Sequence, residues 1–144
     1  MRINEITAEV VDAAMKVHTA LGPGLLESAY EACLLYELQS RGLEVERQVK
    51  LPIVYGDCRI DEGYRLDLLV EDLVIVELKA VIEMNPVFEA QLLSYLKLSG
   101  RPVGLLINFH VPYLRDGIKR MVNKESYARY LAMGDVTSAR RRPD

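Results

Sequence analysis

The chain has 144 residues, of which 50% are apolar and 27% are charged, and its formal net charge is −3 at neutral pH. This length is typical of one globular domain, and the composition excludes a disordered chain. The small negative charge argues against a basic protein that coats nucleic acid without specificity. Apolar runs too short to cross a bilayer and an N-terminus without a secretory pattern predict a cytoplasmic protein that makes no membrane contact.

Two helices are expected at the start of the chain. Across residues 6–21 apolar side chains recur at steps of three and four, and Asn4 is predicted to be the N-cap. Gly22-Pro23-Gly24 ends this helix, because proline lacks an amide hydrogen and glycine tolerates chain reversal. A second helix is expected at about residues 25–41, followed by Gly42 in the position that favours glycine. Its buried side is predicted to carry Leu26, Tyr30, Cys33, Leu34 and Leu38.

A meander of three strands is expected next, because the apolar pattern changes to a period of two. Pro52 indicates a sheet edge or a bulge in the first strand, since it cannot donate to a ladder. Gly56-Asp57 and Glu71-Asp72 are turn signals, and Gly63 predicts a bend in the second strand. The expected strands are residues 43–49 with an extension over 51–55, residues 58–70 and residues 73–80.

A helix and a buried strand complete the predicted core. Asn85 as N-cap and Pro86 in the first turn begin a helix that runs to about Ser99. Gly100 and Pro102 end it, and the continuous apolar run at residues 103–107 is typical of a strand covered on both faces.

The C-terminal part is expected to be helical. The helix is predicted over residues 114–133, within a single domain at residues 1–134, and residues 135–144 are expected to form a mobile basic tail. The order α-α-β-β-β-α-β-α predicts the α/β class, with a mixed sheet flanked by helices. The predicted packing residues of the last helix are Ile118, Met121, Val122, Tyr127, Tyr130 and Leu131.

Glu77 and Lys79 interrupt a strand that is otherwise apolar. Residues two apart on a strand share a face, so these two side chains project together while Val76 and Leu78 point the other way. The pattern Glu-x-Lys is common by chance and could be a solvent-facing pair. Its place on an apolar strand, where an unpaired charge is costly, favours a functional interpretation.

Asp67 on the preceding strand joins this pair only in one register. A two-residue loop between the strands sets Asp67 opposite Val76, on the wrong face, whereas a three-residue loop or a bulge sets it opposite Glu77. Two carboxylates on one face repel each other unless they are protonated or bridged by a cation. Mg²⁺ suits such oxygen ligands, and a nearby lysine would stabilise the charge that develops in phosphodiester cleavage.

The order of elements, the aspartate on the second strand and Glu-x-Lys on the third resemble the PD-(D/E)XK nuclease superfamily. Residues 24–30, Gly-Leu-Leu-Glu-Ser-Ala-Tyr, match the signature of its GxxExxY family. The resemblance continues through residues 91–96 and 103–109 and covers about residues 5–122. Leu66 stands where the superfamily name has proline, a position that is commonly variable.

The resemblance implies a restriction-endonuclease-like fold with an αβββαβ core and extra terminal helices. It also implies that Asp67 and Glu77 bind the metal, that Lys79 is the catalytic lysine and that Glu27 is a further acidic metal ligand. Gln91 and Tyr95 resemble a Q-x-x-x-Y element that lines the site. These six residues form the predicted catalytic set: Glu27, Asp67, Glu77, Lys79, Gln91 and Tyr95.

Helical spacing adds a prediction about the two tyrosines. Glu27 and Tyr30 lie on one helical face, as do Gln91 and Tyr95, so either pair could look into a common cleft. The alternative is that the tyrosines pack in the core with satisfied hydroxyl groups. His18 shares the face of Ala14 and Leu21 and is expected to be structural, and the two cysteines are expected to be reduced.

The expected function is Mg²⁺- or Mn²⁺-dependent hydrolysis of phosphodiester bonds in nucleic acid, DNA more than RNA. The expected partner is therefore nucleic acid, with a homodimer or an unknown protein partner open. The alternative is an inactive nuclease-like module that binds or regulates, such as a homodimer. Intact Asp67, Glu77 and Lys79 weigh against it.

Overall fold

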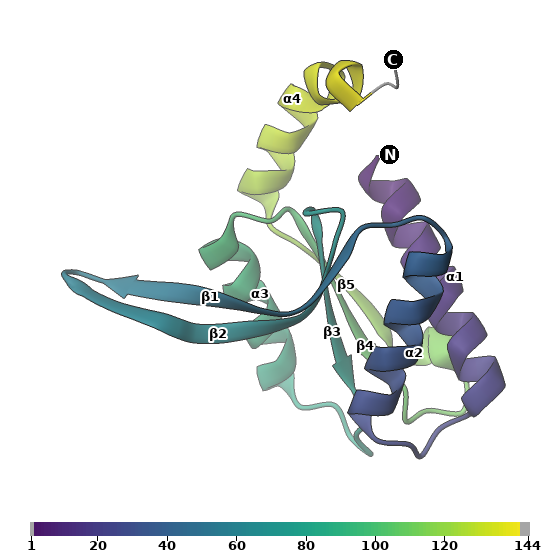
Figure 1. The fold of residues 1–144 in the computed structure, drawn as a ribbon. Helices are drawn as coiled ribbons and strands as arrows, with labels where there is room; N and C mark the ends of the chain where they lie inside the picture. Colours follow the sequence, from purple (N-terminus) through teal and green to yellow (C-terminus); the bar gives the residue numbers. More distant parts are fainter. Residues whose placement is uncertain (1, 142–144) are drawn as a thin grey trace.

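The computed structural model describes residues 2–141, with side chains described up to residue 133, and shows a five-stranded sheet with helices on both faces (Figure 1). The elements in chain order are α1 (Ile3–Leu21), α2 (Glu27–Ser40), β1 (Val45–Tyr55), β2 (Cys58–Val70), β3 (Val74–Lys79), α3 (Pro86–Ser99), β4 (Val103–Asn108), the short 3₁₀ helix η1 (Leu114–Gly117), β5 (Ile118–Val122) and α4 (Lys124–Arg141).

The strands lie in the order β1-β2-β3-β4-β5. Neighbouring strands are antiparallel except β3 and β4, which are parallel and are joined through α3. A parallel pair needs such a crossover, whereas antiparallel neighbours can be joined by short turns. The predicted α/β class, with a mixed sheet flanked by helices and a restriction-endonuclease-like core, is confirmed.

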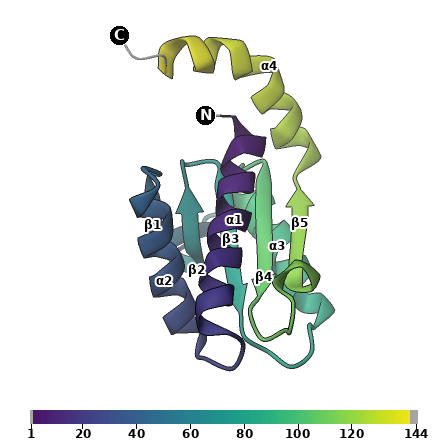
Figure 2. The same ribbon diagram turned by 90° about the vertical axis from the view of Figure 1, so that its right-hand side faces the viewer.

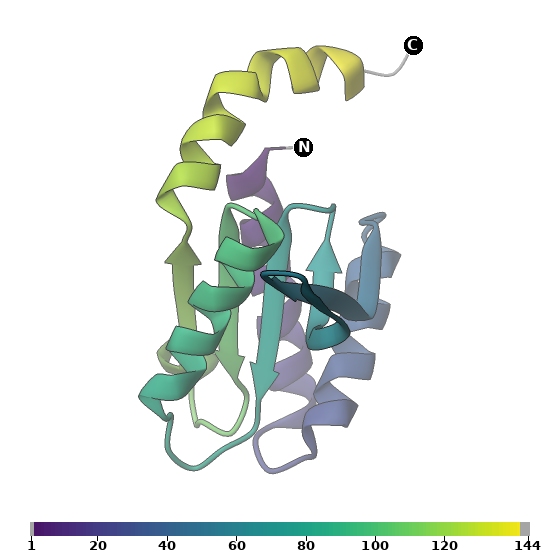
Figure 3. The same cartoon turned by 90° about the vertical axis from the view of Figure 1, so that its left-hand side faces the viewer.

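The sheet separates two apolar clusters, with α1 and α2 on one face and α3 on the other (Figures 2 and 3). We call these the helix-pair face and the α3 face. The helix-pair face holds the larger cluster, which includes Val10, Ala14, Tyr30, Leu34, Leu38, Val76, Leu78, Leu105 and Phe109. The α3 face buries Tyr64, Leu66, Leu69, Ile75, Leu92, Leu96 and Leu106.

Most predicted helix ends are close to the observed ones. The Asn85 side chain accepts a hydrogen bond from the Val87 amide, and Gly100 ends α3 in the left-handed conformation. The predicted N-cap Asn4 is wrong, because α1 begins at Ile3 and Asn4 already lies in its first turn. Leu26 was also expected on the buried side of α2, but it precedes the helix and 77% of it is exposed.

The hairpin of β1 and β2 extends beyond the body of the domain (Figure 1). The register shifts between Leu51 and Ile53, around Pro52, and β1 is an edge strand. Gly63 lies opposite this shift, where an added Cβ would come within 2.4 Å of the Ile53 side chain. The edge position and irregularity predicted at Pro52 are therefore confirmed, and a glycine is needed where the second strand approaches Ile53. The bend predicted at Gly63 stays a prediction.

The predicted single helix at residues 114–133 is wrong. Residues 114–117 form η1, Ile118–Val122 form β5, and α4 begins only at Lys124. A segment of five residues is too short for its apolar pattern to distinguish a helix from an edge strand. Pairing with β4 therefore decides the structure of residues 118–122. Helix α4 then leads away from the sheet and continues to Arg141, while residues 142–144 of the expected basic tail lie outside the described residues. The mobility of that tail stays a prediction.

Two smaller findings bear on the expectations from composition. Within the described part of the chain, no helix combines the length and apolarity needed to cross a membrane. Cys33 and Cys58 are both free thiols, the first half-buried and the second exposed.

Candidate active site

The turn between β2 and β3 sets the register of the site. Val70 pairs with Val74, so the connection has three residues, and Leu68 pairs with Val76 further along. Glu71 and Asp72 adopt φ values of +52° and +58° within this turn. The odd register that the sequence required is confirmed.

Asp67 and Glu77 face each other across the two strands and exchange hydrogen bonds with the opposite backbone. The Asp67 amide donates to Glu77 Oε2 at 2.8 Å, and the Leu78 amide donates to Asp67 Oδ2 at 2.8 Å. Carboxylates thus accept from amides that would otherwise bond to strand carbonyls. Both carboxylates are oriented by main-chain donors, which gives them fixed directions at the point where the strands separate.

The alternation of β2 also breaks at Asp67. Leu66 packs in the cluster of the α3 face, whereas Leu68 packs in the cluster of the helix-pair face. Residues two apart on a regular strand share a face, so the chain turns over at the residue between them. This irregularity directs the Asp67 carboxylate toward β3.

Glu77 is a buried acid with only 8% of its surface exposed. Burial raises its pKa to about 9, and the nearby charge of Asp67 and a shared hydrogen bond with its side chain add to this rise. The Asp67 amide and the Lys79 ammonium act in the opposite direction but do not cancel the rise. In the absence of a cation, Glu77 therefore holds a proton at neutral pH.

Lys79 lies two residues after Glu77, on the same side of β3. Its Nζ is 4.4 Å from the centre of the Phe88 ring on α3, whereas Val76 and Leu78 belong to the cluster on the helix-pair face. The predicted division of the strand between charged and apolar faces is confirmed. The cation–π contact holds the ammonium close to the carboxylates without neutralising it.

Asn108 fixes the chain immediately after Lys79. Its side chain donates to the Val81 carbonyl at 2.9 Å and accepts from the Val81 amide at 3.1 Å, and the Phe109 amide donates to the Lys79 carbonyl at 2.9 Å. Asn108 is 2% exposed, and these contacts satisfy its amide group. No sequence pattern indicated this role, since an asparagine at a strand end is typical of a turn.

Glu27 lies at the first turn of α2, near the end of β3 (Figure 1). Partial burial raises its pKa most, and the Lys79 ammonium and a hydrogen bond from the Ala80 amide oppose this rise. Asp67 also raises the pKa of Glu27, so the two carboxylates lie within electrostatic reach of each other. The structure thus brings Glu27 to the neighbourhood of Asp67 and Lys79.

Tyr30 does not look into this site. It is fully buried, stacks on Phe109 with ring centres 4.4 Å apart, donates its hydroxyl to the Gly22 carbonyl at 2.5 Å and accepts from the Leu25 amide at 3.1 Å. Of the two open interpretations, core packing with a satisfied hydroxyl holds. These two hydrogen bonds fix the loop that precedes α2.

Tyr95 lies within electrostatic reach of Asp67 and Glu77. It stacks on Tyr64 with ring centres 4.8 Å apart, and its pKa is raised by burial and then by the charges of Glu77 and Asp67. Gln91 is exposed on α3, one turn before Tyr95 and three residues after Phe88, so helical spacing places these three side chains along one side of the helix.

A cavity of about 280 Å³ lies beside Asp67, and some of the residues that line it were not predicted as site residues from the sequence. Glu31, Arg47 and Gln48 were all missed. The available signal was the spacing of Glu27 and Glu31, which puts a second acid one helical turn further along, between the buried Tyr30 and Leu34. The residues that line the cavity are Glu27, Ser28, Glu31, Arg47, Gln48, Asp67 and Leu78.

The carboxylate oxygens of this site suit a hard divalent cation. Within the described residues, no three His, Cys, Asp or Glu side chains lie close enough together to make a metal site by themselves, so Glu27 does not complete a cluster with Asp67 and Glu77. Mg²⁺ keeps several water ligands and is commonly bound through one or two carboxylates. Asp67 and Glu77 form such a pair of carboxylates. The raised pKa of Glu77 is what two neighbouring acids show when no cation is bound.

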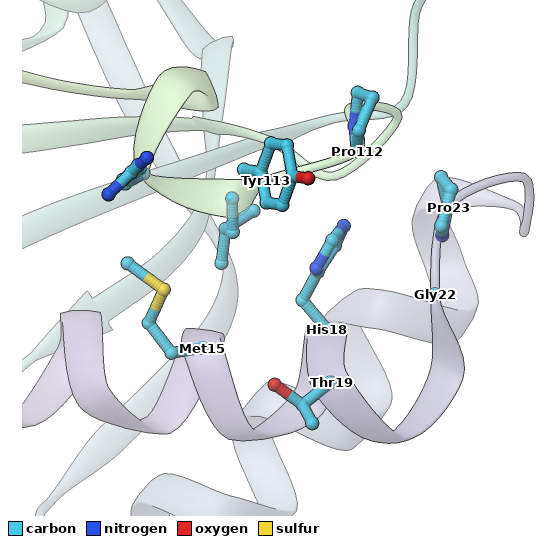
Figure 4. Close-up of a pocket in the computed structure, with 9 residues that line it drawn as sticks. Met15, His18, Thr19, Gly22, Pro23, Pro112 and Tyr113 are labelled. Atoms are coloured by element: carbon cyan, nitrogen blue, oxygen red, sulfur yellow. The ribbon is translucent and has the colours of Figure 1, made fainter.

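A second cavity, of about 540 Å³, lies at the end of α1 and is separate from the acidic residues (Figure 4). His18 and Tyr113 face it from opposite sides, and Met15 and Pro23 contribute to its walls. His18 is 8% exposed and its Nε2 lies 2.8 Å from the Val111 carbonyl oxygen. This contact supports the structural role expected of His18.

Comparison with known proteins identifies one family. The family model of the PD-(D/E)XK nuclease superfamily matches residues 4–121, which span α1 to β5 and include every residue of the candidate site. No significant match was found among curated proteins or among solved structures.

Proposed function

The chain belongs to the PD-(D/E)XK nuclease superfamily, and on this premise we propose that it hydrolyses phosphodiester bonds of nucleic acid with Mg²⁺ or Mn²⁺. The observation that carries the proposal is the pairing of Asp67 with Glu77 beside Lys79. A purely structural sheet would gain nothing from a buried acid that must keep a proton.

Asp67 and Glu77 would hold the cation, and Glu27 would contribute from the start of α2 through a bound water. When bound, the cation supplies Lewis-acid polarisation of a phosphoryl oxygen and lowers the pKa of a bound water. Glu77 would have to release its proton to bind the cation, whose positive charge would offset the repulsion between the two neighbouring carboxylates.

Lys79 would stabilise the negative charge that develops on the phosphoryl group. Its ammonium is held over Phe88 and points to the same side of β3 as Glu77. Gln91 and Tyr95 on α3 would line the site and contact the substrate backbone through amide and hydroxyl groups. In this proposal the strands supply the two main metal ligands, and α3 supplies contacts to the substrate.

DNA is the preferred substrate of the proposal, with RNA as the second choice, and the expected location is the cytoplasm. Membership of the GxxExxY family is part of the proposal and rests on residues 24–30. Within that segment we assign different roles to the two named side chains: Glu27 lies within electrostatic reach of Asp67 and Lys79, and the Tyr30 hydroxyl anchors the preceding loop.

The decisive experiment is a cleavage assay with purified protein and Mn²⁺ on single-stranded, duplex and branched DNA and on RNA. Lys79→Ala serves as the control, because contamination by a host nuclease would leave its activity equal to that of the parent. We expect cleavage of at least one DNA by the parent and a loss of about 100-fold or more in the variant. Equal rates, or no cleavage by either protein, would remove catalysis from the proposal.

A binding measurement tests the metal separately. Titration of the metal-free protein with Mn²⁺ should release heat and raise the melting temperature, and Glu77→Ala should abolish both effects. Retained binding in this variant would show that the cation is held elsewhere.

A further inference from the structure

Gln48 has an unusual backbone for a residue in the middle of a strand. Its φ is +49°, in the left-handed region that glutamine rarely adopts. The other described non-glycine residues with positive φ are Glu71 and Asp72, which form the β2–β3 turn. The ladder between β1 and β2 continues on both sides of Gln48 but skips it together with Asp67. No turn accounts for this conformation, and strain of this kind concentrates at functional sites.

The side chain of Gln48 lies between two carboxylates. Its Nε2 donates to Glu31 Oε1 at 2.6 Å and faces Asp67 Oδ1 at 3.5 Å. Glu31 is itself held in place, since it is only 6% exposed and its Oε2 lies 3.1 Å from Arg47 Nη2. The amide of Gln48 therefore bridges a fixed acid on α2 to the acid of the candidate site.

The chemistry of the amide fixes its orientation. The NH₂ group has two hydrogens, one for each carboxylate, whereas the reversed amide would place its oxygen against two carboxylate oxygens. An amide carries no net charge. It can therefore orient Asp67 while the negative charge of the carboxylate remains available to attract a cation. A lysine or arginine at this position would neutralise Asp67 instead.

We propose that Gln48 is a positioning residue that sets the orientation of Asp67 through the bridge from Glu31. The Leu78 amide holds Oδ2 of Asp67 while Gln48 faces Oδ1, so both oxygens have a defined direction. Glu31 stands one helical turn after Glu27, and the bridge therefore also sets α2 relative to β2. This inference rests on the proposed function, because it treats Asp67 as a metal ligand.

Two variants of Gln48 separate positioning from folding. In Gln48→Gly the backbone keeps a positive φ without strain, and the whole side chain with its amide is lost. In Gln48→Asn the amide remains and the left-handed conformation is tolerated, but the side chain is one methylene too short for the bridge. Metal-free melting temperature reports the fold, and calorimetric titration with Mn²⁺ reports the site.

We expect both variants to unfold cooperatively in the absence of metal, at a melting temperature modestly below that of the parent because Glu31 loses a hydrogen bond, and to bind Mn²⁺ about 10- to 100-fold more weakly. Asp72→Gly is the matched control, since it replaces another left-handed residue of the same sheet away from the carboxylates, and its affinity should equal that of the parent. If the parent binds Mn²⁺ and Gln48→Gly binds it within twofold, the positioning role is overturned while the proposed function stands.

A readout without metal tests the bridge itself. The side-chain amide signals of Gln48 in a ¹⁵N–¹H spectrum are assigned by their absence in Gln48→Gly, and Asp67→Asn should shift them. Unchanged signals would overturn the contact whatever the metal binding shows. Absence of Mn²⁺ binding in the parent would instead overturn the proposed function.

Discussion

Strand β3 contributes to two different surfaces, since Val76 and Leu78 enter the apolar cluster on the helix-pair face whereas Glu77 and Lys79 project to the α3 face. The first pair gains stability by leaving water. The second includes an acid whose buried position raises its pKa. Alternate residues of one strand thus serve stability and chemistry, and the comparison predicts that substitutions on the two faces have separable effects.

The largest expected loss of stability comes from Phe109 on the helix-pair face. Phe109 is fully buried and stacks on Tyr30, so Phe109→Ala should lower the free energy of unfolding by about 3–5 kcal/mol. Denaturant unfolding measures this loss. The folded fraction should bind Mn²⁺ as the parent does, because the backbone contact with Lys79 does not need the ring. Weaker binding at unchanged stability would contradict the separation of the faces.

The opposite pattern is expected for Lys79 on the α3 face. Lys79→Met keeps an apolar stem of similar length and removes the ammonium, so cleavage should slow by about 10²–10³-fold, equivalent to about 2.7–4 kcal/mol of transition-state stabilisation. Steady-state rates on the best DNA substrate measure this loss.

Lys119→Met is the matched control for this prediction. Lys119 is an exposed lysine of β5 that pairs with Glu89 at 2.8 Å. Its removal should leave the cleavage rate within about twofold and the stability within about 0.5 kcal/mol. Equal losses in the two variants would attribute the effect to net charge rather than to the position of Lys79.

Tyr30→Phe is expected to have a smaller effect on stability. The hydroxyl accepts from the Leu25 amide and donates to the Gly22 carbonyl, and its removal leaves both groups without that partner. We expect a loss of about 1–3 kcal/mol, measured by thermal or denaturant unfolding. Tyr95→Phe, on the other face, should change the cleavage rate more than the stability. A reversal of these two results would place Tyr30 rather than Tyr95 at the site.

The sequence was informative wherever a local pattern determines the outcome. The cap at Asn85, the glycine at the end of α3 and the apolar run of β4 were each predictable, since their causes lie within a few residues. The site depended on one non-local choice, the register of β2 against β3. Sequence restricted that choice to an odd connection but did not say whether a loop or a bulge provides it.

The remaining features depend on contacts between distant segments. Gln48 sits in an alternating strand pattern, and nothing local indicates that it reaches both Glu31 and Asp67. In the same way β5 forms because β4 offers an unpaired edge, which overrides the helical pattern expected for residues 118–122. Tertiary pairing decides the structure where local preference is weak.

The last expected effect is a dependence of metal-free stability on pH. The pKa of Glu77 is about 9 in the folded protein and near the ordinary value of 4.5 in the unfolded chain. The folded state therefore binds a proton that the unfolded state has lost, and its contribution to stability is complete below about pH 4.5 and disappears as pH rises toward 9. The raised pKa of Glu27 acts in the same direction. The pKa values of Glu37 and Glu62 are lowered. These two groups therefore affect stability only as pH falls below the ordinary glutamate value of 4.5, outside this window.

Melting temperatures measured in EDTA should thus decrease progressively between pH 5 and about pH 9, as Glu77 loses its proton in the folded protein. Glu77→Gln should remove most of this slope, whereas Glu27→Gln should remove a minor part. Saturating Mn²⁺ should reverse the trend in the parent, since the cation replaces the proton and binds more tightly as pH rises. If the parent and Glu77→Gln show the same slope, the buried acid of the α3 face is not its source, and the contrast between the two faces of β3 loses its electrostatic basis.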